Sequence, residues 1–304
     1  MITVKENYID VPGGKIWSQI ISPDAAKENL TIVFLHGGPG STHDKLKWGL
    51  NSLADKYTLI FYDQLGGGKS ALSDSGNKSD LWTIERFVAE LDCLIRFYNL
   101  NKFILFGTSW GASLALEYYF SNSVAKKLSA LVINSPLVST KMWMEDAKRL
   151  KQAMPLEIYK AMLECEKSGE TLSAKYQEVM QAFYDKHLLQ PSFLNEEQRA
   201  LIEDTAKLFN EEAYLHMWGP SEFYATGTLV DYDRYEDLAK IDIPVLFSCG
   251  EYDEATPESL YKFYQKLPGS YYEVIQGCSH QAYFEKPQEF RLMLEPFLEQ
   301  FLHN

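Results

Sequence analysis

A serine lies between two glycines in the segment Gly107–Gly111, which reads Gly-Thr-Ser-Trp-Gly. An apolar run, Phe103–Phe106, precedes this segment, and a helix-prone stretch, Ala112–Phe120, follows it. The pattern is typical of a strand–turn–helix unit that exposes a nucleophilic serine at the tip of the strand. Both glycines are needed because a side chain at either position would clash with neighbouring backbone in so tight a turn. We therefore predict that Ser109 is a catalytic nucleophile and not part of an ordinary strand–helix turn.

A serine hydroxyl needs a base, and the chain has six histidines. In folds with this serine turn, the partners follow in the chain order serine, acid, histidine. That order leaves four candidates: His187, His216, His280 and His303. Only His280 comes directly after a predicted strand, in a loop at the strand's carboxyl end. We predict that His280 is the base.

The acid of such a triad should follow the preceding strand. The apolar run Val245–Cys249 leads into Gly250–Glu254, where three carboxylates compete for the role. We predict Asp253, with Glu251 as the alternative. The acid would fix the histidine tautomer and stabilise the imidazolium that forms during the reaction.

Acyl transfer also needs two N–H donors for the oxyanion. One is expected from the backbone of Trp110, directly after the nucleophile. The second is expected from the glycine-rich segment His36–Gly40, with Gly38 as the donor, because glycine lets the backbone approach a reacting carbonyl closely. We interpret His36 as a brace for this loop, not as a base. The other glycine-rich segment, Asp63–Ser70, lacks the spacing of a phosphate loop and is predicted to shape the floor of the pocket.

Short apolar runs rich in β-branched and aromatic residues predict strands. They are Thr31–Leu35, Tyr57–Tyr62, Phe103–Phe106, Ala130–Ile133, Ile243–Phe247 and Tyr271–Ile275. Apolar residues at helical spacing predict a helix over 84–98, with Thr83 as its N-cap, and a closing helix over 290–301. The alternation favours right-handed crossovers and a mostly parallel sheet. With the serine turn, it predicts the α/β-hydrolase fold.

Residues 141–237 have a different character: they are charged, aromatic and helix-prone. Pro155 could open one helix, and Asn195–Gln198 resembles a capping box that opens another. We predict a helical cap over residues 138–238, inserted between core segments 1–137 and 239–304. Such insertions usually lie over the carboxyl ends of the strands, where ligands bind.

The composition excludes several classes of protein. The 304 residues carry a net charge of −13 and contain no basic run that would follow a nucleic acid backbone. The charge favours solubility and would also attract cationic substrates. We expect no membrane span, since no apolar run is long enough to cross a bilayer. We also expect no metal or cofactor, since the four cysteines are dispersed and form no metal-binding pattern. Isolated cysteines and the lack of a signal-like N-terminus favour the cytoplasm.

Several motifs together resemble the proline iminopeptidases, which are α/β-hydrolase aminopeptidases that include an archaeal enzyme that interacts with the tricorn protease. The motifs are His36–Gly40, Tyr62–Gln64, Gly107–Gly111, Trp218–Phe223 and Gly250–Glu254. The serine turn is common to many hydrolases. The cap motif Trp218–Phe223 and the Asp253–Glu254 pair are far more specific.

The resemblance implies that Glu222 and Glu254 hold the free amine of the substrate and that Tyr214 contacts the substrate. It also implies that aromatic cap residues wall a pocket for a proline ring, although such residues more often pack the cap itself. They are Trp143, Trp218, Phe223 and Tyr224.

We therefore expect a serine aminopeptidase that releases N-terminal proline, and other apolar residues, from short peptides with a free N-terminus through an acyl-enzyme. The same Ser-His-Asp triad would also suit an amino-acid amidase, a carboxylesterase or a lactonase. A non-catalytic protein that kept the fold is a further alternative. The complete Ser-Asp-His set argues against it. The oligomeric state is left open.

Overall fold

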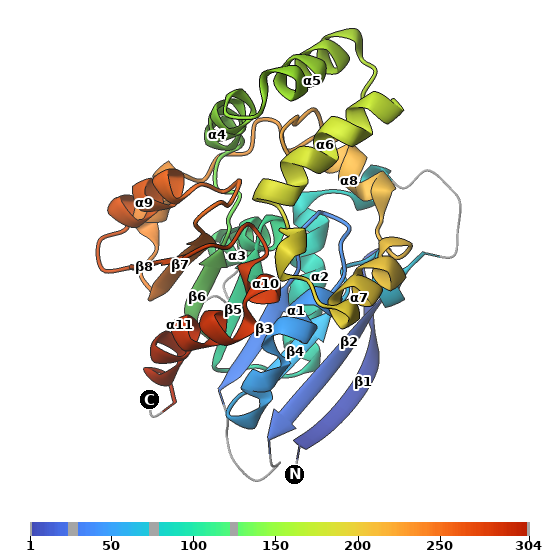
Figure 1. Ribbon diagram of the computed structural model, residues 1–304. Helices are drawn as coiled ribbons and strands as arrows, with labels where there is room; N and C mark the ends of the chain where they lie inside the picture. The colour runs from blue at the N-terminus through green and yellow to red at the C-terminus, as the bar shows by residue number, and fades with distance from the viewer. Residues whose placement is uncertain (1, 24–29, 73–78, 122–126, 303–304) are drawn as a thin grey trace.

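The computed structural model describes residues 2–23, 30–72, 79–121 and 127–302 (Figure 1). Within these residues, eight strands form one sheet in the order β1-β2-β4-β3-β5-β6-β7-β8. Their bounds are β1 Ile2–Val11, β2 Gly14–Pro23, β3 Thr31–Leu35, β4 Thr58–Tyr62, β5 Phe103–Thr108, β6 Leu128–Asn134, β7 Val245–Gly250 and β8 Tyr271–Ile275. The six strands from β3 to β8 are parallel, as the predicted α/β-hydrolase fold requires.

All six predicted strands are present, with small changes at their ends. The main change is at Pro244, which was placed inside a strand but precedes β7. Proline has no N–H to donate to a neighbouring strand, so its exclusion has a direct cause.

The sequence analysis missed the antiparallel hairpin of β1 and β2. Most of β1 is exposed, so its side chains lack the apolar run by which the inner strands were found. The signal that could have revealed it is the Pro12–Gly14 turn between the two strands.

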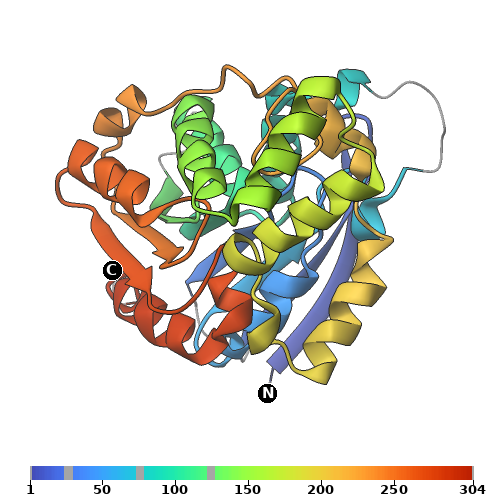
Figure 2. The ribbon, with the colours of Figure 1, turned by 45° about the horizontal axis from the view of Figure 1, so that its top comes forward.

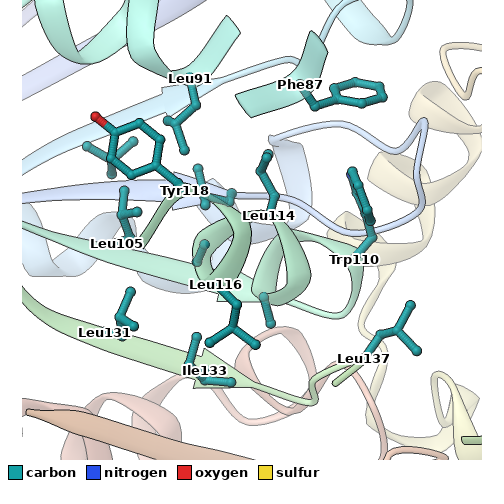
Figure 3. Close-up of a cluster of buried hydrophobic side chains, with 14 of the residues drawn as sticks. Phe87, Leu91, Leu105, Trp110, Leu114, Leu116, Tyr118, Leu131, Ile133 and Leu137 are labelled. Atoms are coloured by element: carbon teal, nitrogen blue, oxygen red, sulfur yellow. The ribbon is translucent and has the colours of Figure 1, made fainter. Parts of the chain in front are cut away.

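Alternate residues of the inner strands belong to two apolar layers. In β5, Leu105 packs in one layer, whereas Ile104 and Phe106 pack in the other. Figure 3 shows part of the first layer, where Leu105 and Leu131 lie beneath side chains of the helices. Because both faces are covered, the inner strands β3, β4, β5 and β7 are buried along their whole length.

The helices of the core cover these two faces. Helices α2 (Ile84–Phe97), α3 (Trp110–Ser121) and α9 (Pro257–Lys266) contribute to the first layer. The second layer receives α1 (Asp44–Leu50), α10 (Ala282–Glu285) and α11 (Pro287–Glu299). The predicted N-cap of α2 is confirmed, since the Thr83 side chain accepts a hydrogen bond from the Arg86 N–H at 3.3 Å.

A group of helices is inserted in the chain between β6 and β7, as predicted (Figures 1 and 2), although the two strands are neighbours in the sheet. They are α4 Thr140–Gln152, α5 Leu156–Ser168, α6 Ala174–His187, α7 Glu196–Ala206 and α8 Glu211–Met217. The capping box at the start of α7 is confirmed, with both Asn195 and Gln198 hydrogen bonds in place. Pro155 precedes α5 as its N-cap, one position before the first helical turn. The limits 138–238 for the cap stay a prediction.

The cap is tied to the core loops by backbone hydrogen bonds. Asn210 donates to the Gly40 carbonyl at 2.8 Å, and Gly68 donates to the Leu208 carbonyl at 2.9 Å. The entry to α8 is therefore held against the glycine-rich loops that follow β3 and β4. None of the described helices combines the length and apolar character needed to cross a membrane.

Candidate active site

Ser109 lies in the sharp turn between β5 and α3. Its backbone has φ of +57°, in the left-handed region that a non-glycine residue rarely adopts. A Cβ added to Gly107 would lie 2.3 Å from the Gly111 carbonyl oxygen, and one added to Gly111 would lie 2.1 Å from the Leu35 carbonyl oxygen. Both glycines are therefore required, as the sequence predicted.

The loop after β3 passes directly against this turn. A Cβ added to Gly37 would lie 3.0 Å from the Ser109 Cβ, so backbone and nucleophile are in close approach. Gly38, the predicted oxyanion donor, has φ of +110° and lines the same cavity as Ser109. The structure thus places both predicted donor segments, around Gly38 and Trp110, at the nucleophile.

His36 braces this loop, as predicted. Its Nε2 accepts a hydrogen bond from the Gln64 N–H at 3.0 Å, and the Gln64 side chain donates to the His36 carbonyl at 2.9 Å. Burial lowers the pKa of His36, in keeping with a neutral ring whose Nε2 is an acceptor. Gln64 also accepts a hydrogen bond from the Trp110 indole at 2.9 Å, which links this brace to the serine turn.

The prediction that Asp63–Ser70 shapes the pocket floor is wrong, because none of these residues lines the cavity. The segment lies behind the loops and holds them. The Asp63 carboxylate accepts hydrogen bonds from the His43 backbone N–H at 2.8 Å and ring Nδ1 at 2.7 Å, and from the Lys69 N–H at 2.9 Å.

The structure brings His280 and Asp253 together. The His280 Nδ1 lies 2.7 Å from the Asp253 Oδ1, and both side chains are buried. Asp253 is itself oriented by the N–H groups of Ala255 at 2.8 Å and Gly250 at 3.3 Å. Burial opposes the charged form of His280, but the charge of Asp253, its hydrogen bond and the charges of Glu222 and Glu285 together outweigh this effect, so the pKa of His280 is raised.

The alternative candidates lie elsewhere. Glu251 accepts a hydrogen bond from the Gly277 N–H at 2.8 Å. The ring of His187 is bonded to the Tyr252 carbonyl at 2.8 Å. His216 is half-buried in α8 and does not line the cavity, and His303 is outside the described residues.

A cavity of about 520 Å³ opens between the core and the cap. Ser109, Gly38 and His280 line it from the core, and Tyr214 and Glu222 line it from the cap. Among the described residues, no group of three or more histidine, cysteine, aspartate or glutamate side chains is arranged to hold a metal ion.

Two carboxyl groups lie beside His280. Glu254 is 2% exposed, and neither of its side-chain oxygens has a hydrogen-bond partner among the described residues. Its Oε1 is 4.0 Å from the His280 Nδ1. Burial, with the charges of Glu222 and Asp253, raises the pKa of Glu254 well above its usual value. Burial also raises the pKa of Glu222, although His280 and Tyr214 oppose this effect.

The aromatic cap residues expected to wall the pocket, Trp143, Trp218, Phe223 and Tyr224, do not line the cavity. Phe223 packs against Phe183, with ring centroids 4.8 Å apart, in a separate apolar cluster of the cap. Trp143 instead lies beside the site: its ring centroid is 5.8 Å from that of His280, and its indole donates to the Glu222 carbonyl at 2.8 Å.

Two groups at the site were missed from the sequence. Tyr184 of α6 lines the cavity, and its hydroxyl accepts a hydrogen bond from the Glu222 N–H at 3.2 Å. Asn134, at the end of β6, donates to the Thr108 hydroxyl at 3.0 Å and accepts from the Ser248 hydroxyl at 2.9 Å, which ties three strand ends together. A polar residue at the carboxyl end of a predicted strand is the signal that could have revealed Asn134; no comparable signal marks Tyr184.

Comparison with known proteins shows which family the chain belongs to. The family described as alpha/beta hydrolase fold matches residues 31–287. A proline iminopeptidase of Heyndrickxia coagulans is 34% identical over 293 residues, which cover 96% of this chain and 98% of that protein. The chain belongs to the proline iminopeptidase family of α/β hydrolases.

Solved structures with a similar level of sequence identity support the family assignment. The crystal structure of VinJ superposes with a TM-score of 0.87 at 30% identity, covering 97% of this chain and 98% of that one. The proline iminopeptidase of Mycobacterium smegmatis superposes with a TM-score of 0.84, also at 30% identity and with the same coverage. The likeness of family members therefore extends over core and cap alike.

We predict that Gly111→Ala destroys the serine turn, because the added methyl group would lie 2.1 Å from a carbonyl oxygen. Unfolding should become easier by at least about 3 kcal/mol, and labelling by a fluorophosphonate should be lost. Gly169→Ala is the matched control, since Gly169 also has positive φ (+76°) but nothing within 4 Å of an added Cβ. It should cost only about 1–2 kcal/mol. Equal effects in denaturant titrations would contradict this account.

The raised pKa of His280 predicts a pH profile. An imidazole that takes the proton of a serine must be neutral, so hydrolysis of an activated ester should rise with pH, with a midpoint above about 6.5, the ordinary value for histidine. Asp253→Asn removes the charge that raises this pKa and should lower kcat about 10⁴-fold. A wild-type midpoint below 6.5 would show that Asp253 does not control the ring.

Proposed function

We propose that this protein is a serine aminopeptidase that releases N-terminal proline, and other apolar residues, from short peptides through an acyl-enzyme on Ser109. The observation that carries the proposal is the pair Glu222 and Glu254 beside the Asp253–His280 pair. A carboxylate without a donor in a buried site is unfavourable unless a cation neutralises it. The ammonium or imino nitrogen of a free N-terminus supplies that cation.

The position of the clamp sets which bond is cleaved. Glu222 lies on the cavity wall and Glu254 is buried behind it, near His280. An amine held there places the first carbonyl of the chain, and no later one, within reach of Ser109. Tyr184 and Tyr214, whose hydroxyls face Glu222, complete the polar wall. Trp143 packs against His280 and donates to the Glu222 carbonyl, which helps to position both residues.

The reaction then follows from the neighbouring groups. Ser109 attacks the first carbonyl while His280 Nε2 takes its proton, and Asp253 stabilises the resulting imidazolium. The backbone N–H groups of Gly38 and Trp110 receive the negative charge of the oxygen. His280 then gives the proton to the leaving amine, which departs and leaves the acyl-enzyme.

The second half repeats these steps with water. His280 removes a proton from water, which attacks the acyl carbon, and the same N–H groups again hold the oxyanion. Collapse releases the free amino acid and restores Ser109. We expect the enzyme to work in the cytoplasm, which the four unpaired cysteines support.

A panel of substrates tests the proposal. We predict that the protein cleaves aminoacyl coumarin amides of proline, alanine, leucine and phenylalanine, fastest for proline, and that N-acetylation lowers kcat/KM at least about 100-fold by removing the cation. Ser109→Ala should abolish release of the fluorophore. Glu222→Gln should raise KM for the free-amine substrates and should not change the hydrolysis of the acetylated ones.

The panel also separates the alternatives. Cleavage of a p-nitrophenyl ester with indifference to a free amine would refute the clamp and favour an esterase or lactonase. Cleavage of proline amide without release of proline from peptides would indicate an amino-acid amidase.

A further inference from the structure

Lys45 is a cation on the wall of the active-site cavity. It belongs to the first turn of α1, directly after the glycine loop that approaches Ser109. Its side chain lines the same cavity as Ser109 and His280. It is half-buried, and its Nζ forms no hydrogen bond or salt bridge with any described residue.

A comparable lysine elsewhere in the chain is paired. Lys151, in the cap, donates to both carboxylate oxygens of Glu166, at 2.9 and 3.0 Å, and lies 5.3 Å from the ring centroid of Phe223. Lys45 has no such compensation. Burial alone lowers the pKa of Lys45 to about 8, and no carboxylate contributes. Removing the ammonium group of Lys45 from water costs free energy, and no contact with the described residues offsets this cost. Such a cation is suited to bind an anion from solution.

Lys45 is not paired with the amine clamp. The charge of His280 acts on Glu222, and the charges of Glu222 and Asp253 act on Glu254, whereas neither acid contributes to the pKa of Lys45. Glu211 is the other carboxylate on the cavity wall, and its charge does not act on Lys45. The cavity wall therefore presents Glu222, one member of the acidic pair, at one place and Lys45 at another.

A short peptide carries charges that match this arrangement. Its N-terminal ammonium fits the acidic pair, and its C-terminal carboxylate lies at most about 3.3–3.6 Å further away for each added residue. The cavity of about 520 Å³ is within the range that encloses a small ligand. We propose that Lys45 binds the C-terminal carboxylate of short peptides, so that the enzyme recognises both ends of its substrate. This inference rests on the proposed aminopeptidase function.

The test compares free acids with amides. The substrates are Pro-Gly, Pro-Gly-Gly and Pro-Gly-Gly-Gly, each with a free or an amidated C-terminus, and released proline is quantified by chromatography. We expect wild-type kcat/KM to favour the free acid of at least one length by about tenfold or more, mainly through KM, as suits a hydrogen bond to a charged group. Lys45→Met should lower this acid-to-amide ratio to about one, and Lys45→Arg should keep most of it.

Lys47→Met is the matched control. Lys47 lies on the same helix and carries the same charge, but it does not line the cavity. Its substitution should leave the acid-to-amide ratio at the wild-type value, which separates local recognition from the overall charge of the protein. Thermal unfolding of each variant reports on folding.

The outcomes distinguish the two proposals. Equal kcat/KM for acids and amides at every length, or a ratio that Lys45→Met does not change, would overturn the role of Lys45 and leave the aminopeptidase proposal standing. Failure of the wild-type protein to release proline from either series would overturn both.

Discussion

The close approach of two backbone turns at Ser109 is the constraint on which the rest of the site depends. The loop after β3 and the turn after β5 meet where Gly37, Gly107 and Gly111 leave no room for side chains. This contact fixes the nucleophile, brings the Gly38 segment beside it, and starts α3 at Trp110. Much of the nearby polar structure serves to hold it: His36, Gln64 and Asp63 brace one turn, and Asn134 ties the other to β6 and β7.

The serine turn is common to many hydrolases, and the charged groups around it are the basis of the proposed substrate specificity. An imidazole whose pKa Asp253 raises lies beside two acids whose own pKa values burial raises. Neither oxygen of Glu254 has a donor among the described residues, so the burial of this acid costs free energy. In the proposed clamp, a substrate cation pairs with the acids, and part of that cost returns as binding free energy. The proposed role of Lys45 follows the same principle with the opposite charge: a lysine that is unpaired among the described residues, on another part of the cavity wall, binds an anion.

The sequence predicted what local physics determines. The apolar runs located the inner strands, and the glycines located the serine turn, because both patterns reflect contacts close to the residues themselves. Its position after a strand selected His280 over His187, and the structure pairs His280 with Asp253, whereas the His187 ring is bonded to the Tyr252 carbonyl. The features that could not be predicted depend on packing between segments that are far apart in the sequence. The role of Asp63–Ser70 was misjudged because only the fold reveals that the loops lie between it and the cavity. Tyr184 and Lys45 gave no signal, since nothing in a helix sequence tells which residues face a cavity formed by another part of the chain.

The central claim is that the buried acids bind the amine of the substrate as a cation. Isothermal titration calorimetry of Ser109→Ala with prolinamide, in buffers of different ionisation enthalpy, measures the protons exchanged on binding. Because the pKa values of Glu222 and Glu254 are raised in the free protein, a bound ammonium should lower them and release protons at any pH where the free acids are still protonated. N-acetylprolinamide should bind weakly and release none. Equal affinity for the two ligands, with no proton release for either, would contradict the account.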